Sequence, residues 1–357
     1  MRIVCRIVLA SFALGTVSAQ DRSAAQWSPA KAASYLDSRM EWWMGWETAQ
    51  REQGTFCVSC HTAAPYALGR PFLRAALNES AASADERRLI ENVAKRVRLW
   101  KELAPLYPDS EKNPGKTAES RGTEAVLNAL VLAANHSPDA PAALNIMWDE
   151  QLKTGDSKGA WNWLQFHNSP WEGDSQFYGA ALAAVAVGYA PAAYQSSPEV
   201  QEHLRALRDY FARECGSQKL IDKVALLWAS EKLSELLPTT ERDAIVKETL
   251  AAQRDDGGFS LSQFVGAWKR KDNTPLETKS DGYATGMVAF VLQQTGMKPS
   301  DPPVRRALDW LRRNQEQSDG RWLAYSLNKQ RDLSSDPGRF MSDAATAYAV
   351  MALESAR

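Results

Sequence analysis

Six segments rich in alanine, leucine and other apolar residues recur along this chain, and they limit its fold more than any other feature. Each is apolar on more than one face, which is typical of a helix buried on all sides. Amphipathic segments alternate with them at a spacing of about 50–60 residues, longer than in the common helical-pair repeats. The apolar segments begin at Thr62, Gly122, Asp174, Leu220, Ser280 and Ser342, and the amphipathic ones cover 29–51, 85–104, 139–152, 198–214, 240–253 and 302–316.

This alternation predicts an all-α chain of the (α/α)6 toroid type, with six inner helices surrounded by six outer ones. The apolar segments are too apolar to line an open groove, and the chain begins with an outer helix and ends with an inner one. An open superhelical array of stacked helix pairs is the alternative. Because no linker rich in Pro, Gly or Ser divides the sequence, we expect residues 20–357 to form one domain.

The junctions between amphipathic and apolar segments carry a family resemblance. The stretches AAQRDDGGFSLSQF at 251–264 and NQEQSDGRWLAYS at 314–326 resemble the Gln-Trp repeat motif of the squalene–hopene cyclase and prenyltransferase superfamily, and 149–163 is a looser copy. The segments 280–290 and 342–353 resemble inner helices of that superfamily. The resemblance implies a toroid in which Gln at a helix end, Gly at the turn and an aromatic residue in the loop tie neighbouring repeats together.

The resemblance does not extend to the chemistry of the superfamily. Its cyclases start carbocation reactions with an Asp-x-Asp-Asp run, which this sequence lacks; Asp255 and Asp256 belong to the loop motif, and Asp332 and Asp336 have the wrong spacing. The Asp-x-Cys that zinc-dependent prenyltransferases have near an inner helix is missing too. Since a fold can be inherited without its chemistry, we do not expect a protonation-started cyclase.

Residues 57–61 read C-V-S-C-H, a C-x-x-C-H motif that is typical of covalent attachment of a c-type haem. In this interpretation Cys57 and Cys60 form thioethers with the haem, and His61 is an axial ligand of the iron. Two alternatives stay open, a disulfide between Cys57 and Cys60 and a different metal. The zinc alternative is weaker, because a structural zinc site needs four ligands, usually from two such cysteine pairs.

The N-terminus predicts export. Residues 1–19 combine two arginines, an apolar run and small residues before Gln20, which is the pattern of a secretory signal peptide. The apolar run is shorter than the about 20 residues that a membrane span needs. We therefore expect a periplasmic or extracellular protein without a membrane span, in which Cys215 is the one cysteine outside the motif. The net charge of −1 gives no reason to expect nucleic acid as a partner.

The motif lies in the loop 53–62, between the first amphipathic and the first apolar segment, where later repeats have their Gln-Gly-aromatic junction. We therefore expect the haem at the mouth of a central cavity. His167, in the loop before the third apolar segment, and Met341, at the start of the sixth, are candidates for the sixth iron ligand. The alternatives are a hydrogen-bonded loop histidine and a core methionine.

Three further residues are candidates at this mouth. Arg70 could pair with a haem propionate or form an ordinary buried ion pair. Glu172 and Asp174 are the expected members of an acidic rim that could supply a proton donor. The alternative for such acidic residues is a capping role, because carboxylates favour the positive end of a helix.

Two classes of function follow from these patterns. The first is a redox protein with one haem, which passes electrons to a partner protein if the sixth position is filled. If that position is open, it would be an oxidoreductase acting on a hydrophobic small molecule such as an isoprenoid. The alternative is a non-haem toroid, cyclase-like or carbohydrate-active, with a Cys57–Cys60 disulfide; a glycan-degrading enzyme would use two carboxylates, and Glu172 and Asp174 are the close pair expected there.

Overall fold

The computed structural model describes residues 27–167, 170–171 and 176–357. The predicted signal peptide and the candidate residues Glu172 and Asp174 therefore lie outside the described residues. In the described part the chain is built almost entirely from helices, which confirms the all-α prediction. Two short strands, β1 (Gln50–Arg51) and β2 (Thr55–Phe56), pair in antiparallel fashion just before the C-x-x-C-H motif.

The predicted apolar segments form six helices that we call the central helices. Their sides are buried almost all round, as their composition predicts. They are α2 (Ala63–Ala76), α4 (Lys116–Ala134), α6 (Phe177–Gly188), α9 (Leu220–Lys232), α12 (Gly282–Gln294) and α14 (Asp336–Glu354).

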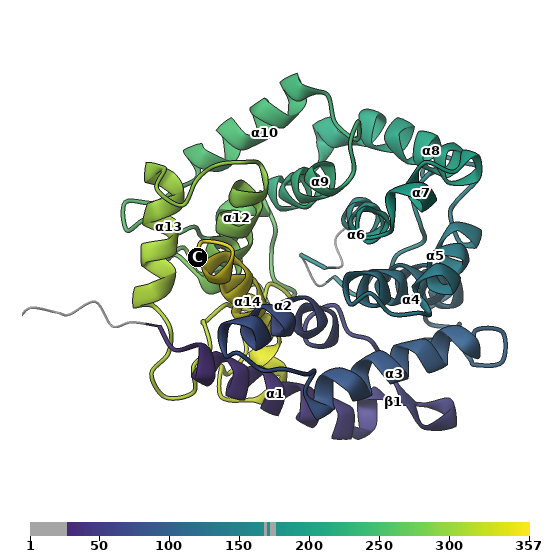
Figure 1. Cartoon of the computed structure of the whole chain (residues 1–357), viewed down its shortest axis with the longest axis horizontal. Coiled ribbons are helices and arrows are strands. Elements are labelled where there is room, and N and C mark those ends of the chain that lie inside the picture. The colour runs from purple at the N-terminus through teal and green to yellow at the C-terminus, as the bar shows by residue number, and fades with distance from the viewer. Residues whose placement is uncertain (1–26, 168–169, 172–175) are drawn as a thin grey trace, which may run out of the picture.

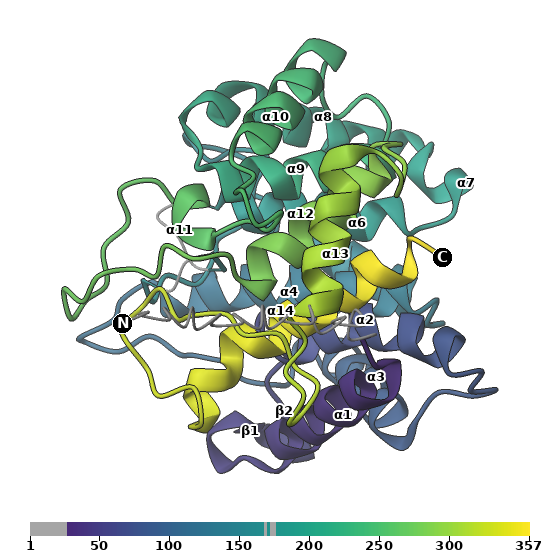
Figure 2. The same cartoon turned by 90° about the vertical axis from the view of Figure 1, so that its left-hand side faces the viewer.

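The predicted amphipathic segments form six helices that we call the peripheral helices. Each lies outside the central set (Figure 1). Two short helices, α7 (Ala192–Gln195) and α11 (Leu261–Phe264), lie in connecting loops (Figure 2). The peripheral helices are α1 (Pro29–Gly45), α3 (Ala84–Arg98), α5 (Ala140–Asp149), α8 (Pro198–Glu214), α10 (Thr239–Ala251) and α13 (Pro302–Arg313).

The contacts between central helices follow the chain order and return to their start. Each central helix contacts the next, and the last, α14, packs against the first, α2 (Figure 1). In the side view, β1 and α11 lie toward one end of the molecule, and α7 and the C-terminus lie toward the other (Figure 2). None of the helices in the described ranges combines the length and the apolar character that crossing a bilayer requires.

One boundary differs from the prediction in a way that matters for the site. The sixth apolar segment was expected to begin at Ser342, but α14 begins at Asp336. Ser335 caps this helix by accepting a hydrogen bond from the backbone N–H of Gly338, and Pro337 lies in its first turn, where a missing N–H costs nothing. Met341 therefore lies in the second turn of α14 and is buried there.

Small residues set the distance between central helices. A Cβ atom built on Gly286 of α12 would lie 2.6 Å from the backbone nitrogen of Ala349 of α14. A Cβ on Gly69 of α2 would lie 3.0 Å from the Cα of Ala347, on α14 as well. The backbones of these helices meet so closely that there is no room for a side chain, which is why glycine stands at both positions.

We expect Gly286→Val to lower the free energy of unfolding by about 2–3 kcal/mol, because three added carbons must push α12 away from α14. Urea denaturation followed by circular dichroism measures this change. Gly216→Val is the matched control, since nothing lies within 4 Å of a Cβ built there, and its effect should stay within about 0.5 kcal/mol. Equal effects of the two substitutions would contradict close packing at Gly286.

Candidate haem-attachment site

The loop that holds the C-x-x-C-H motif is fixed on its N-terminal side by three elements. The side-chain amide of Asn92 on α3 accepts from the backbone N–H of Phe56 (2.8 Å) and donates to its carbonyl (3.0 Å). The N–H of Cys57 donates to the carbonyl of Ala49 (2.8 Å), and the indole N–H of Trp43 donates to the carbonyl of Cys57 (2.7 Å). The backbone that precedes the motif is therefore held before any ligand binds, as a preorganised site requires.

The motif also begins the first central helix. The hydroxyl of Ser59 accepts hydrogen bonds from the backbone N–H groups of Thr62 (3.2 Å) and Ala63 (3.0 Å). These are donors at a helix start that have no partner within the helix, so Ser59 satisfies them as a capping residue does. Cys60 and His61 consequently stand in the tight turn that leads into α2.

Aromatic rings surround the imidazole of His61. Phe340 of α14 stacks on it with ring centroids 3.8 Å apart, and Trp43 of α1 meets it edge-on at 5.0 Å. The indole of Trp171 lies 5.7 Å away. Burial, and after it the nearby cations Arg39 and Arg331, together lower the pKa of His61 to about 3. His61 is therefore neutral at physiological pH, which is the form that binds a metal.

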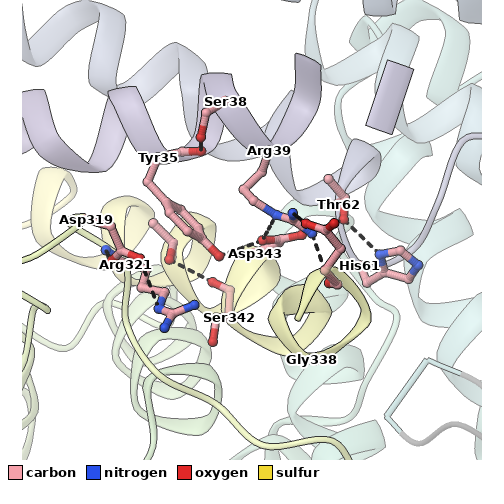
Figure 3. Close-up of polar contacts among 12 residues, drawn as sticks. Tyr35, Ser38, Arg39, His61, Thr62, Asp319, Arg321, Gly338, Ser342 and Asp343 are labelled. Atoms are coloured by element: carbon pink, nitrogen blue, oxygen red, sulfur yellow. Dashed lines mark hydrogen bonds and ion pairs between the residues drawn. The ribbon is translucent and has the colours of Figure 1, made fainter. Parts of the chain in front are cut away.

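A buried polar network ties His61 to three helices (Figure 3). Its Nδ1 lies 2.8 Å from the hydroxyl of Thr62, and that hydroxyl lies 2.8 Å from Oδ2 of Asp343 on α14. The other carboxylate oxygen of Asp343 accepts from the hydroxyl of Tyr35 (2.7 Å) and from Nε of Arg39 (2.9 Å), both on α1. The first peripheral helix and the last central helix thus meet at the motif.

A small cavity of about 50 Å³ borders the motif. Cys57, Cys60 and His61 line it together with apolar side chains that include Leu127 and Trp171. Cys57 is buried and Cys60 half-buried. The order and chemistry of these donors fit a covalently held haem. The cavity is smaller than a porphyrin, so attachment requires the side chains around it to move apart.

The two candidates for the sixth ligand differ in their surroundings. His167 stacks on Trp268 at 4.1 Å, and its Nε2 lies 3.1 Å from the carbonyl oxygen of Lys269. It does not line the cavity beside the motif. Met341 is buried in α14 next to Phe340, the residue that stacks on His61. Ligation of iron by either residue stays a prediction.

Arg70 takes the second role that the sequence left open, a buried ion pair. Its Nε lies 2.9 Å from Asp37, and its NH1 lies 2.7 Å from Glu79. These carboxylates also accept hydrogen bonds from its NH2, so each nitrogen of the guanidinium has a protein partner. Within the described residues, no group of three or more His, Cys, Asp or Glu side chains is arranged to hold a metal ion.

Sequence reasoning missed the residues that surround His61. Phe340, Trp43 and Asp343 were not predicted to lie beside His61. The sequence offers no local signal for their contacts with His61, because Asp343 is 281 residues from Thr62 along the chain. The order Ser335-Asp336-Pro337, however, is a recognisable helix start that would have placed Phe340 inside α14.

Comparison with known proteins gives no relative from which a role could be transferred. No family model matches the chain, and no curated protein matches it significantly.

Proposed function

We propose that this chain is an exported protein that carries one covalently attached haem c on an (α/α)6 toroid and transfers electrons to a partner protein. The observation that carries the proposal is the state of His61 within the C-x-x-C-H motif. It is neutral, its Nδ1 is engaged by Thr62, and its Nε2 makes no hydrogen bond within the described residues. That is the arrangement expected of an imidazole that serves as an axial ligand.

The toroid is supported by the order of helix contacts. Six central helices contact one another in chain order and α14 returns to α2, whereas the first and last members of an open array would not meet. Within this fold Cys57 and Cys60 would hold the haem and His61 would ligate its iron. The haem supplies one-electron chemistry when bound, and the chain supplies position and an apolar environment.

Electron transfer is favoured over substrate oxidation by the aromatic residues around the motif. Trp42 and Trp46 are half-buried, and their rings stack with centroids 5.0 Å apart. The ring centroid of Trp43 lies 5.5 Å from that of Trp46 and 5.0 Å from that of His61, so aromatic rings connect the imidazole to the surface. Electron-transfer encounters use small interfaces, and tryptophan is a frequent anchor residue in interfaces.

The test is a visible spectrum of the chain after export from a host with cytochrome c maturation machinery. We expect a colour that persists after denaturation, with the bands of a reduced c-type haem, and none in the Cys57→Ala/Cys60→Ala variant. Carbon monoxide should leave the spectrum of the reduced native protein unchanged if the sixth position is filled. Carbon monoxide binding would instead favour the oxidase alternative, and a colourless protein would contradict haem attachment.

A further inference from the structure

We infer that Asp343, acting through the hydroxyl of Thr62, is a positioning residue that keeps the proton of His61 on Nδ1 and leaves Nε2 as the free ligand atom. The consequence for iron rests on the proposed function. The proton position itself is a property of the polypeptide and can be measured without haem.

Asp343 is buried beside a cation. Its side chain is only 1% exposed, and the guanidinium of Arg39 lies 2.9 Å from Oδ1. The hydroxyl of Tyr35 also points to Oδ1, at 2.7 Å. Burial raises the pKa of this carboxyl, and Arg39, Tyr35 and Thr62 offset part of that rise. The charge of Asp343 is indicated by its ion pair, because the buried guanidinium of Arg39 keeps its own charge and lies against Oδ1. With a cation and two hydroxyl groups as its only hydrogen-bond partners in the described chain, the group is held as a carboxylate, which can only accept.

The direction of the next hydrogen bond follows. Because the carboxylate of Asp343 has no proton to give, the hydroxyl of Thr62 donates to Oδ2 across 2.8 Å. A hydroxyl has a single proton, so only its lone pairs face Nδ1 of His61, which lies 2.8 Å away. His61 must therefore donate from Nδ1. A neutral imidazole carries a single ring proton, so with that proton on Nδ1 the lone pair of Nε2 is left for a ligand.

The imidazole of His61 lines the small cavity beside the motif. Phe340 stacks on the face of the imidazole with an angle of 23° between the planes, and a metal binds at the edge of the ring. In Figure 3 the imidazole extends away from Asp343. The network also places a negative charge one hydroxyl away from the ring, which makes the imidazole a stronger electron donor. A stronger donor favours the oxidised iron, so the network should lower the reduction potential of an attached haem.

A purely structural role is the alternative, because the same residues join α1 to α14. The ion pair of Arg39 with Asp343 and the bond from Tyr35 would hold the helices together whatever the proton of His61 did. The substitution Thr62→Val removes the hydroxyl at almost constant volume and leaves that ion pair in place. Thr62→Ser keeps the hydroxyl and is the matched control.

The first experiment measures the ring nitrogens of His61 by proton–nitrogen NMR in the full chain made without haem. The signal is assigned by its loss in His61→Gln. We expect a protonated Nδ1 and a bare Nε2 in the native chain and in Thr62→Ser, and a shift toward the Nε2-protonated form in Thr62→Val. A native chain protonated at Nε2, or a Thr62→Val chain that keeps the native pattern, would overturn the inference.

The second experiment measures the reduction potential of the haem-loaded chains. We expect the potential of Thr62→Val to be higher than that of the native protein, and the potential of Thr62→Ser to stay near the native value. Equal potentials in all three, with an unchanged NMR pattern, would leave the network a structural role only. If no haem is incorporated, the proposed function fails, while the NMR result still decides the position of the proton.

Discussion

Replacing Arg39 with methionine should lower the free energy of unfolding by about 3–5 kcal/mol. Arg39 is 3% exposed and bonds to Asp343 through Nε (2.9 Å) and to Asp336 through NH1 (2.7 Å). Without the guanidinium, Asp343 remains buried with a charge that nothing offsets, and breaking a buried pair on one side is strongly unfavourable. The loss should be greatest at the contact between α1 and α14.

Chemical denaturation of the variant and the native chain tests this prediction. Arg312→Met is the matched control, because Arg312 pairs with Asp309 where both side chains are 39–43% exposed. Such surface pairs contribute about 1 kcal/mol or less. The double variant Arg39→Met/Asp343→Leu should recover part of the loss, since it removes the unpaired charge as well. If Arg39→Met and Arg312→Met lower the free energy of unfolding equally, Arg39 does not stabilise the buried charge of Asp343.

The second large effect is a pH dependence that comes from Asp222, near the start of α9. Burial raises its pKa to about 7, and Lys219 opposes the shift. An acid whose pKa is raised in the folded state binds more protons there than in the unfolded chain, so stability falls as pH rises between the two pKa values. From pH 5 to pH 8, the contribution of Asp222 to the free energy of unfolding should fall by about 3 kcal/mol.

The comparison with Asp222→Asn isolates this contribution, because asparagine does not ionise and the other carboxyl groups are common to both chains. The free energy of unfolding of the variant, relative to that of the native protein, should be higher at pH 8 than at pH 5. Asp281→Asn is an informative second variant: burial raises the pKa of Asp281 to about 6, but that carboxylate also accepts backbone N–H bonds from Leu261 and Ala284. A pH-independent difference for Asp222→Asn would contradict the prediction.

The helices could be predicted from the sequence because their information is local. Apolar periodicity reports which segments are buried, and six buried segments separated by six amphipathic ones require a helical fold. The turn that holds the C-x-x-C-H motif was equally predictable, since its place between the first two segments follows from chain order. Ser59, within the motif, caps the start of the helix that follows it, which is also a local interaction.

The contacts around His61 could not be predicted because they form only where the last central helix packs against the first. Phe340 and Asp343 reach the motif only after α14 has packed against α2. The predicted start at Ser342 placed Met341 at the beginning of the helix. In the structure the cap at Ser335 makes α14 more than a turn longer at its N-terminus, and Phe340 in this added part stacks on the imidazole. Sequence periodicity reports how much of a helix is buried, but not which residue of a distant helix it will meet.

The intact mass of the chain, purified from a host with cytochrome c maturation machinery and recorded under denaturing conditions, tests haem attachment most directly. A covalent haem predicts the mass of the processed polypeptide plus one haem, and the polypeptide alone when Cys57 and Cys60 are both replaced by alanine. The account would be contradicted by a native chain whose mass is that of the polypeptide alone, or of the polypeptide less the two hydrogens lost in a disulfide between those cysteines.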